Sequence, residues 1–471
     1  MKKPDPKIAR LIQAGVQHHQ AGRLEDAKAI YREVLQRDPA HPDALHLLGV
    51  ISNQQGNPAA AAELIERAIR RHSDAASYHV NLGNAYWELG RADEAVRCFE
   101  RALQLDPRAA EAWTNLGNAC QRGGQNALAV QHFLRALEIN PNHLSALRGL
   151  GKTLAAQGDA ARSIEVNLRA LALAPHDEGI LAELAAAFYR SSRLNDAVQC
   201  MQRLVEIHPG KLDYRLQHCR FLHEAGRPAE ALASAEALAA AHPNEALAQN
   251  HLGWILGNNN RFSEANAAFD RAIELQPDLP QPWVNRAVAM WRIGRIPEAI
   301  EAARHASEAA PENDEARSTY LMFLNYDAAL SPEQIRDQHL AWGRARARGS
   351  AARARRHASL PPKPRLRVGY VSGDFRMHSV GFFIEPLLQC HDRSRVEVYC
   401  YAANAVSDPK TPRLRALADA WREVHALSDD QLRDQIAQDG IDVLVDLAGH
   451  TAEGRIPVFA LRPAPVQVSY L

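Results

Sequence analysis

The stretch "VNLGNAYWELGRADEAVRCFERALQLDP" (residues 80–107) returns 34 residues later as "TNLGNACQRGGQNALAVQHFLRALEINP" (residues 114–141). Each copy has a glycine near its start, an alanine twelve residues after that glycine, and a proline at its end. The same positions recur through residues 1–313. The prolines are Pro39, Pro107, Pro141, Pro175, Pro209, Pro243, Pro277 and Pro311. The glycines are Gly15, Gly49, Gly83, Gly117, Gly151 and Gly253, and the alanines are Ala27, Ala61, Ala95, Ala129, Ala197, Ala231, Ala265 and Ala299.

Small residues at facing positions allow two antiparallel helices to pack closely, and a proline near the end of each unit stops the second helix. One helix pair cannot bury its apolar face alone, so such units stack into a superhelix with a concave binding surface. A 34-residue period with this pattern resembles the tetratricopeptide repeat. We therefore expect residues 1–313 to form an α-solenoid of nine repeats, and nothing in this region looks catalytic.

Asparagine recurs at one position of the repeat, two residues before the glycine, as Asn81, Asn115 and Asn285. An amide side chain is both donor and acceptor, so a row of asparagines can pair with the backbone of an extended peptide regardless of its sequence. The alternative is that asparagine is simply common at this position of such repeats. Six of the nine units lack it, so any row is interrupted.

After Pro311 the period fails, and we expect a helical linker over residues 314–364. "SPEQ" at Ser331 is a helix-start signal. An arginine-rich run at residues 344–356 favours a solvated helix face or linker over a nucleic-acid patch, because alanines rather than aromatic residues separate the arginines. "LPPKP" (residues 360–364) interrupts any helix and marks the domain boundary.

From residue 365 the pattern changes to short apolar, β-branched runs that alternate with helix-like segments. The predicted strands are residues 365–372, 396–402, 441–449 and 466–471, and the predicted helices are residues 380–389, 411–421, 428–440 and 455–461. This alternation indicates a parallel sheet with right-handed crossovers, in an α/β lobe over residues 365–471.

Ligands of such sheets bind beyond the carboxyl ends of the strands. That rule selects "SGDFRMHS" after the first strand and "DLAGHTAEGR" after the third, with one histidine each, His378 and His450. A histidine there can act as a general base or can bond a phosphate or a sugar hydroxyl, and the alternative is a surface histidine. No GxGxxG or P-loop pattern occurs.

Composition limits the other possibilities. Lysine plus arginine equals aspartate plus glutamate, 55 against 55, so no overall charge points to nucleic acid or a membrane. The six cysteines form no CxxC pair and no cluster with zinc spacing, which fits a reducing, cytoplasmic setting. We find no signal-peptide pattern and no apolar run long enough for a membrane span, and we expect no metal and no cofactor.

"RLRVGYVSGDFRMHSVGFFIEPLL", "VEVYCYA", "QDGIDVLVDLAGHTAEGR" and "FALRPAPVQVSYL" together resemble the start of the catalytic region of O-linked N-acetylglucosamine transferases, in which a tetratricopeptide superhelix precedes that region. The resemblance implies a metal-independent, inverting glycosyltransferase with two Rossmann-like lobes in a GT-B fold. It also implies that N-acetylglucosamine (GlcNAc) moves from UDP-GlcNAc to Ser or Thr hydroxyls of proteins, and that the superhelix holds the acceptor polypeptide.

Four residues take roles from this resemblance. His378 matches the family's loop histidine, a base or an orienter of acceptor and sugar, and Asp374 matches an acidic residue that shapes the turn. His450, where animal members tend to have tyrosine, is expected to contact donor or acceptor, and so are Asp374 and Arg455. In the family the second lobe grips the uridine and diphosphate, and no such lobe precedes Leu471, so we expect the 471 residues alone to be an inactive fragment.

Two alternatives stay open from the sequence. One is a tetratricopeptide scaffold for protein–protein interaction without catalysis. The other is a related bacterial glycosyltransferase that uses another sugar nucleotide or a dedicated acceptor.

Overall fold

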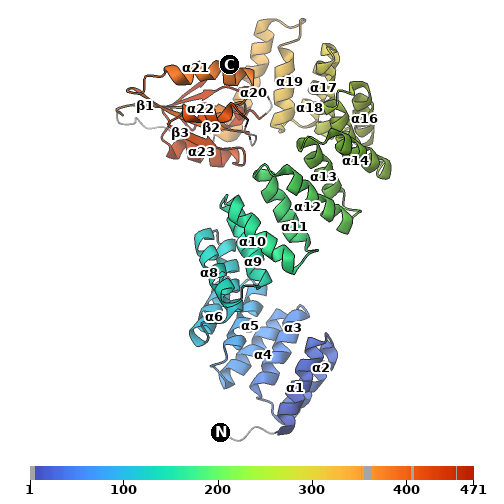
Figure 1. Ribbon diagram of the computed structural model, residues 1–471, viewed down its shortest axis with the longest axis vertical. Helices are drawn as coiled ribbons and strands as arrows, with labels where there is room; N and C mark the ends of the chain where they lie inside the picture. The colour runs from blue at the N-terminus through green and yellow to red at the C-terminus, as the bar shows by residue number, and fades with distance from the viewer. Residues whose placement is uncertain (1–5, 352, 355–362, 405–407, 452, 471) are drawn as a thin grey trace. The chain divides into compact units, whose positions relative to one another are not determined.

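The computed structural model describes residues 6–351, 353–354, 363–404, 408–451 and 453–470. The chain contains two compact units, Met1–Pro209 and Gly210–Leu471. Helices occupy the first unit, and the second begins with helices and ends with a small sheet (Figure 1). The division lies inside the repeat array, whereas the sequence places the end of the repeats at residue 313.

The helices of the first unit follow one another in antiparallel pairs joined by short turns (Figure 1). They are α1 Pro6–Gln20, α2 Leu24–Arg37, α3 Pro42–Gln54, α4 Pro58–Arg71, α5 Ala76–Glu88, α6 Ala92–Leu105, α7 Ala110–Arg122, α8 Asn126–Ile139, α9 Leu144–Ala156, α10 Ala160–Leu173, α11 Glu178–Arg190 and α12 Leu194–Ile207. Each helix packs against the next, and first helices of successive pairs, such as α7 and α9, also contact each other. These first helices therefore form one continuous face.

A glycine and an aromatic ring bring the two helices of a pair together. A Cβ added at Gly83 would lie 2.5 Å from Cε1 of Phe99, and one at Gly117 would lie 2.6 Å from Cε1 of Phe133. Both rings are buried, so neither can move aside. The glycine register of the sequence therefore marks the point of closest approach between the helices of each pair.

We predict that Gly117→Ala destabilises the first unit, because overpacking a closed core costs about 1–3 kcal/mol and the higher helix propensity of alanine returns less than about 1 kcal/mol. Gly123→Ala is the matched control: Gly123 is the C-cap of α7 with φ −78°, and an added Cβ meets only backbone oxygens at 3.6 Å. Urea unfolding followed by circular dichroism measures both. Equal unfolding midpoints for the two variants would contradict the packing account.

In the second unit the repeat continues and then gives way to two further helices. The helices are α13 Leu212–Glu224, α14 Pro228–Ala241, α15 Ala246–Asn258, α16 Phe262–Leu275, α17 Pro280–Arg292, α18 Ile296–Ala309, α19 Asp314–Leu324 and α20 Pro332–Ser350. Between residues 6 and 309, all of which are described, the helices form nine successive pairs. Ser331 begins α20 through a capping box with Gln334, which confirms the helix start. Residues 355, 356 and 360–362, at the arginine run and the expected boundary, lie outside the described residues.

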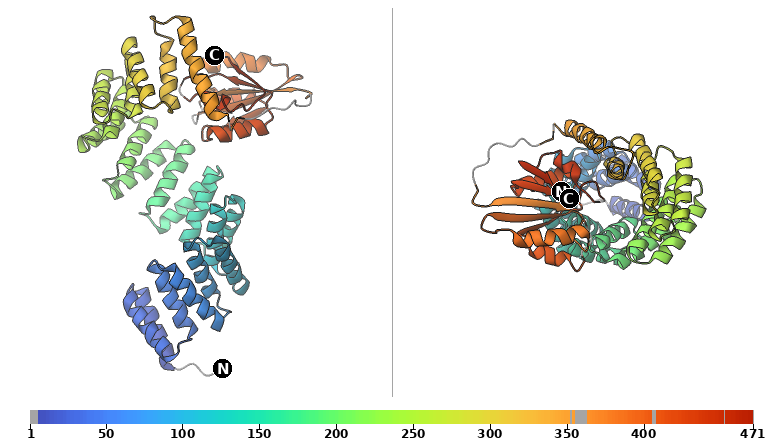
Figure 2. Two further views of the ribbon diagram at one scale, coloured as in Figure 1. Left: turned by 180° about the vertical axis from the view of Figure 1, so that it is seen from behind. Right: turned by 90° about the horizontal axis from the view of Figure 1, so that it is seen from above.

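The sheet is parallel throughout, as the sequence predicts, with the strand order β3-β2-β1-β4-β5. Its strands are β1 Leu366–Ser372, β2 Val396–Ala402, β3 Ala420–Glu423, β4 Val443–Asp446 and β5 Val466–Ser469. The connecting helices are α21 Ser379–Cys390, α22 Thr411–Ala416, α23 Asp429–Gln438 and α24 Ile456–Phe459. Helices α21 and α23 lie on opposite faces of the sheet (Figures 1 and 2).

Alternate residues of the strands fill two separate cores. Tyr370 points to the face where Ile384 and Leu388 of α21 are buried, and its neighbour Val371 points to the face of Leu432 in α23. Both faces are covered by helices, which explains why the strand sequences are apolar in continuous runs. β1 is central, so the loop that follows it starts from the most buried part of the sheet.

The predicted helix over residues 411–421 is wrong in its second half. α22 ends at Ala416, and the chain enters β3 at Ala420. Asp419 decides the change: its backbone N–H donates to the carbonyl of Val398 at 2.9 Å, and its carboxylate accepts from the N–H of Val398 at 2.7 Å. These bonds to β2 override a local sequence that favours helix.

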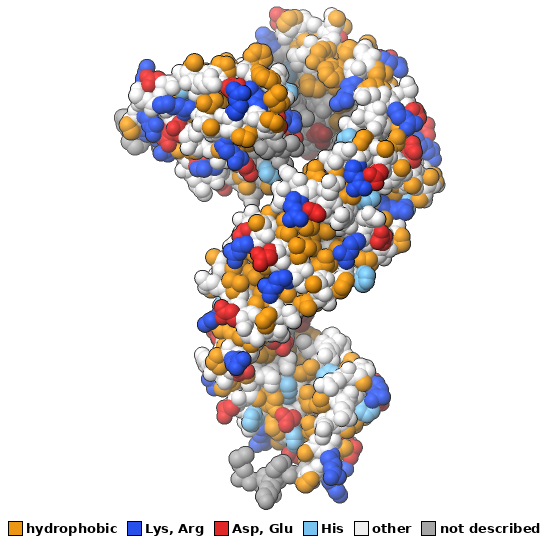
Figure 3. All heavy atoms as spheres, viewed as in Figure 1, with side chains coloured by type: hydrophobic (Ala, Val, Ile, Leu, Met, Phe, Trp, Pro, Cys, Tyr) orange, Lys and Arg blue, Asp and Glu red, His pale blue; other side chains and the backbone are white. Residues whose placement is uncertain are grey.

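None of the described helices has a stretch long and apolar enough to span a bilayer. On the face shown in Figure 3, cationic and anionic side chains are interspersed over the helices. That distribution agrees with the equal numbers of acidic and basic residues.

Candidate functional site

Two loops meet at the carboxyl edge of the sheet, the loop after β1 (residues 373–378) and the loop after β4 (residues 447–455). The N–H of Leu447 donates to the carbonyl of Val371 at 3.1 Å, so the loops leave adjacent strands side by side. A Cβ added at Gly373 would lie 2.6 Å from Cβ of Glu453, so the loops also touch further along. The sheet therefore brings together the two loops that the sequence selects.

The loop after β1 is fixed by short local contacts. Ser372 Oγ accepts from the N–H of Asp374 at 2.9 Å, and Thr411 Oγ1 donates to the carbonyl of Phe375 at 2.9 Å. Asp408 accepts from the N–H of Met377. A Cβ added at Gly381 would lie 2.2 Å from the carbonyl oxygen of Arg376, so only glycine allows the loop to fold back over the start of α21.

His378 stands at the end of this loop as the N-cap of α21. Its Nδ1 accepts from the N–H of Val380 at 3.3 Å and lies 3.6 Å from Oδ2 of Asp374. The His378 side chain is 44% exposed, whereas that of Asp374 is only 6% exposed. A histidine in this position can present Nε2 to a ligand while its other nitrogen is held by the protein.

Arg376 joins the two loops electrostatically. Its Nη2 lies 3.1 Å from Oδ1 of Asp374 and 3.7 Å from Oε2 of Glu453. Burial raises the pKa of the Glu453 carboxyl, and Arg376 partly opposes that rise. Glu453 also has a positive φ of 63°. The four side chains Glu453, Arg376, Asp374 and His378 thus form one row of neighbouring polar groups across the edge of the sheet.

Asp446, the last residue of β4, shapes the second loop. Its carboxylate accepts from the N–H groups of Ala448 at 3.1 Å and Gly449 at 3.0 Å. Burial raises the pKa of this carboxyl, and the two backbone bonds act in the opposite direction. Gly449 has φ +56°, and a Cβ added at Gly454 would lie 2.6 Å from the carbonyl oxygen of Gly449. The loop therefore turns sharply, and its His450 is directed toward α19 and α20.

His450 faces helices α19 and α20 of the same unit. Its Nδ1 is 3.0 Å from Oγ of Ser318, its Nε2 is 3.2 Å from Nδ1 of His339, and Trp342 packs edge-on with ring centres 5.0 Å apart. Burial, with a smaller contribution from His339, lowers the pKa of His450 to about 4. Both ring nitrogens are engaged, so in this state His450 fastens the loop to the helices.

Arg455 is held by α23 and the segment before it. Its guanidinium lies 2.8 Å from Oδ1 of Asp429 and donates to the carbonyls of Val424 at 3.1 Å and Leu427 at 2.9 Å. Only 14% of its side chain is exposed. Its contact with donor or acceptor stays a prediction.

The predicted asparagines each bond to the preceding repeat. Nδ2 of Asn81 is 2.8 Å from Nε2 of His46, and Nδ2 of Asn115 donates to Oδ1 of Asn84 at 2.7 Å. In the second unit, Nδ2 of Asn285 donates to Oδ1 of Asn250 at 2.9 Å. These bonds fix the orientation of each amide through its nitrogen.

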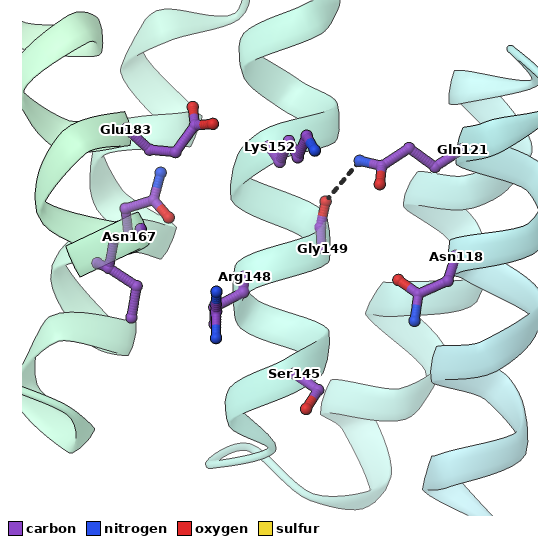
Figure 4. Close-up of a pocket in the computed structure, with 10 residues that line it drawn as sticks. Asn118, Gln121, Ser145, Arg148, Gly149, Lys152, Asn167 and Glu183 are labelled. Carbon is purple, nitrogen blue, oxygen red and sulfur yellow. Dashed lines mark hydrogen bonds between the residues drawn. The ribbon is translucent and has the colours of Figure 1, made fainter. Parts of the chain in front are cut away.

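A pocket of about 420 Å³ lies where the row of asparagines is interrupted (Figure 4). Gly149 of α9 occupies the asparagine position there, and a Cβ added to it would lie 2.4 Å from Cζ of Phe133. Lys152 of α9, Glu183 of α11 and Asn118 of α7 surround it, and Gln121 donates to the carbonyl of Gly149 at 3.4 Å. Most of the side chains that line the pocket are polar, and they come from α7, α9 and α11, the first helices of their pairs, with Asn167 added from α10.

Comparison with known proteins assigns the two parts of the chain. Residues 222–280 and 252–314 match the tetratricopeptide repeat model, and residues 7–211 match the C-terminal domain of cilia and flagella-associated protein 70. Residues 351–471 match the model described as glycosyl transferase family 41. This part of the chain is therefore similar to a glycosyltransferase family 41 domain. This finding confirms the predicted fold class, a tetratricopeptide solenoid followed by an incomplete glycosyltransferase lobe.

Named relatives agree with the family 41 match. A probable UDP-N-acetylglucosamine-peptide N-acetylglucosaminyltransferase, SPINDLY from Petunia hybrida, is 32% identical over 165 residues, which cover 34% of this chain and 18% of that protein. The Caenorhabditis elegans UDP-N-acetylglucosamine-peptide N-acetylglucosaminyltransferase is 41% identical over 110 residues, 23% of this chain and 10% of that one. The matched part is thus about a fifth or less of each relative.

Among solved structures, a mutant of the Thermobaculum terrenum O-GlcNAc transferase is similar, with 35% identity and a TM-score of 0.50 over 55% of this chain and 50% of that chain. Together these comparisons confirm the resemblance to the O-linked N-acetylglucosamine transferase family. Within the described residues no group of three or more His, Cys, Asp or Glu side chains is arranged to hold a metal.

Sequence reasoning missed Arg376 and Glu453 of the family 41 domain and the partners of His450. Arg376 and Glu453 stand in the two loops that were selected, but only the fold shows that they face each other. Ser318 and His339 stand 132 and 111 residues before His450 and carry no motif. No sequence pattern identifies either of them as a partner of a loop histidine.

We predict that His450→Gln makes the stability of the chain less dependent on pH. The pKa of His450 is about 4 in the folded chain and about 6.5 when unfolded, so the unfolded state binds more protons between these values. The contribution of neutral His450 is complete above pH 6.5 and is lost as the pH falls toward 4. Urea unfolding at pH 7.5 and pH 4.5 should show a larger loss for the wild type than for the variant.

The glutamine can still form hydrogen bonds to Ser318 and His339, so the comparison isolates the effect of proton binding by His450 on stability. His339→Gln is the companion variant and should also reduce the pH dependence, because burial lowers the pKa of His339 as well. The interpretation of this cluster is wrong if the wild type and His450→Gln lose the same stability between the two pH values.

Proposed function

We propose that this chain takes part in the inverting transfer of GlcNAc from UDP-GlcNAc to Ser or Thr hydroxyls of proteins, without a metal or other cofactor. The observation that carries the proposal is the position of His378 in the region that matches family 41. It lies in the loop beyond the carboxyl end of the central strand β1, and its ring is partly exposed. The names of the relatives, which are peptide N-acetylglucosaminyltransferases, agree with it. We further propose that the complete fold is GT-B and that the protein works in the cytoplasm, where its cysteines, free in the described residues, stay reduced.

In the proposed reaction His378 acts at the acceptor. Nε2 takes the proton of the Ser or Thr hydroxyl as the oxygen attacks C1 of the sugar, and the bond from C1 to the UDP oxygen breaks on the opposite side. The configuration at C1 is thereby inverted. The carboxylate of Asp374, whose Oδ2 lies 3.6 Å from Nδ1, stabilises the imidazolium formed in this step, and Arg376 keeps that carboxylate in place.

The first helices of the repeats supply the surface for the acceptor polypeptide. The free amide oxygens of Asn81 and Asn115 can accept from the N–H groups of an extended chain, whatever its sequence. Because their nitrogens are already bonded, these amides lose little freedom when a peptide binds. The pocket at Gly149 can receive a polar side chain of the same peptide.

The His378 assignment is tested with two variants. Asparagine is a good N-cap but cannot take a proton at neutral pH, so we predict that His378→Asn keeps the unfolding midpoint and loses about 10²–10⁴-fold in transfer. His378→Ala should lose as much transfer and also about 1 kcal/mol of stability, because the cap is gone.

Transfer of radiolabelled GlcNAc from UDP-GlcNAc to a Ser/Thr peptide is measured with the 471-residue chain and with the longest reading frame that contains it. Wild-type transfer by His378→Asn would exclude His378 as the base. Transfer from a different sugar nucleotide only, or to a single dedicated acceptor, would favour the related bacterial activity, and peptide binding without any transfer would favour a scaffold.

For the acceptor surface, we predict that Asn81→Ala combined with Asn115→Ala weakens peptide binding about tenfold, since two backbone hydrogen bonds worth about 0.5–1.5 kcal/mol each are lost. Fluorescence anisotropy with a labelled Ser-rich peptide measures the affinity. Asn126→Ala, at the first position of the second helix of a pair, is the control and should bind as the wild type does. Equal affinity for the double variant and the control would remove the asparagine row from the proposal.

A further inference from the structure

Two groups compete for one nitrogen of His378. The N–H of Val380 donates to Nδ1 at 3.3 Å, which requires Nδ1 to carry no proton. The carboxylate oxygen Oδ2 of Asp374 lies 3.6 Å from the same nitrogen, and a bond to it requires Nδ1 to carry a proton. A neutral imidazole has one proton and two nitrogens, so these two interactions exclude each other.

The competition decides what the exposed nitrogen can do. When Nδ1 caps α21, the ring proton is on Nε2, and Nε2 can donate a hydrogen bond but cannot accept a proton. When Nδ1–H points to Asp374, Nε2 has a free lone pair and can act as a base. The capping form of His378 is therefore inactive as a base, although the ring stays in place and accessible.

The surroundings of Asp374 leave one of its carboxylate oxygens available to compete with the N–H of Val380 for Nδ1 of His378. Its side chain is 6% exposed, its own N–H is held by Ser372 Oγ, and its Oδ1 is taken by Arg376 Nη2 at 3.1 Å and Nε at 3.3 Å. The remaining oxygen, Oδ2, faces His378. Glu453 Oε2 lies 3.7 Å from the same Arg376 Nη2, so the arginine that holds Asp374 is itself shared between both loops.

We propose that His378 is a tautomeric switch in which Asp374 and the first turn of α21 compete for Nδ1, and that Arg376 tunes this competition by holding Asp374. Asp374 and Arg376 are positioning residues in this account, because they act on the reaction only through His378. The inference rests on the proposed function for its catalytic meaning, but the proton position itself can be measured without any substrate.

The experiment records long-range proton–nitrogen correlations of the histidine rings in the full chain labelled with ¹⁵N-histidine. Nitrogen shifts distinguish protonated from bare ring nitrogens, and a pH of about 8.5 keeps an ordinary histidine neutral. The signal of His378 is assigned by its loss in His378→Asn. His450, whose nitrogens both have partners elsewhere, is the internal reference.

We expect the wild type to show mainly Nε2–H with a measurable fraction of Nδ1–H. Asp374→Asn should remove that fraction, because an amide can no longer draw the proton to Nδ1. Arg376→Gln should raise it at least twofold, because the carboxylate loses its competing cation. Arg336→Gln, in an exposed pair with Asp337 on α20, is the matched control and should match the wild type.

The inference is overturned if Asp374→Asn and the wild type have the same ratio of tautomers, or if Arg376→Gln lowers the Nδ1–H fraction. An unchanged His450 signal and an unchanged circular dichroism spectrum show that a variant is folded. The two proposals fail on different results. Wild-type transfer by His378→Asn rejects the base role, whatever the tautomer ratio is. A tautomer ratio that is the same in Asp374→Asn and the wild type rejects the switch, whatever the transfer rate is.

Discussion

The close contact between a glycine and the side chain sixteen residues later is the constraint on which the helical part of the structure depends. Gly15 meets Tyr31, Gly83 meets Phe99 and Gly117 meets Phe133, and in each case an added Cβ would lie within 2.6 Å of the ring. The contact fixes how near the two helices of a pair can lie, and so it fixes the face that they offer to the next pair. Repetition at 34 residues follows, because each pair must present the same surface to its neighbours.

The same contact tolerates variation where the partner changes. At Gly151 an asparagine, Asn167, replaces the ring and stays 1% exposed because its Nδ2 donates to Ser163 Oγ. Ser163 is the single exception in the alanine register, and its hydroxyl donates to the carbonyl of Gly151. The two departures from the pattern therefore compensate for each other. The pocket at Gly149 is lined in part by Asn167 of this altered pair.

At the carboxyl edge of the sheet, two histidines that the sequence places in equivalent loops have different surroundings. His378 lies in the loop after the central strand, is the N-cap of α21 and has a partly exposed ring. His450 is turned by Asp446 and Gly449 toward α19 and α20. The ion pairs around His378 are partly exposed, and such pairs contribute little stability. Their effect is to orient Asp374, as the proposed proton transfer at His378 requires.

The sequence by itself determined the nine helix pairs, the parallel sheet and the two loops at its edge, because periodicity and strand alternation are local properties of the chain. It also placed His378 and Asp374 together, since they are four residues apart. Only the tertiary structure decided that β3 begins at Ala420, that His450 faces Ser318 and His339, and that Arg376 meets Glu453. Each of these depends on segments distant in sequence, and no local pattern encodes such a contact.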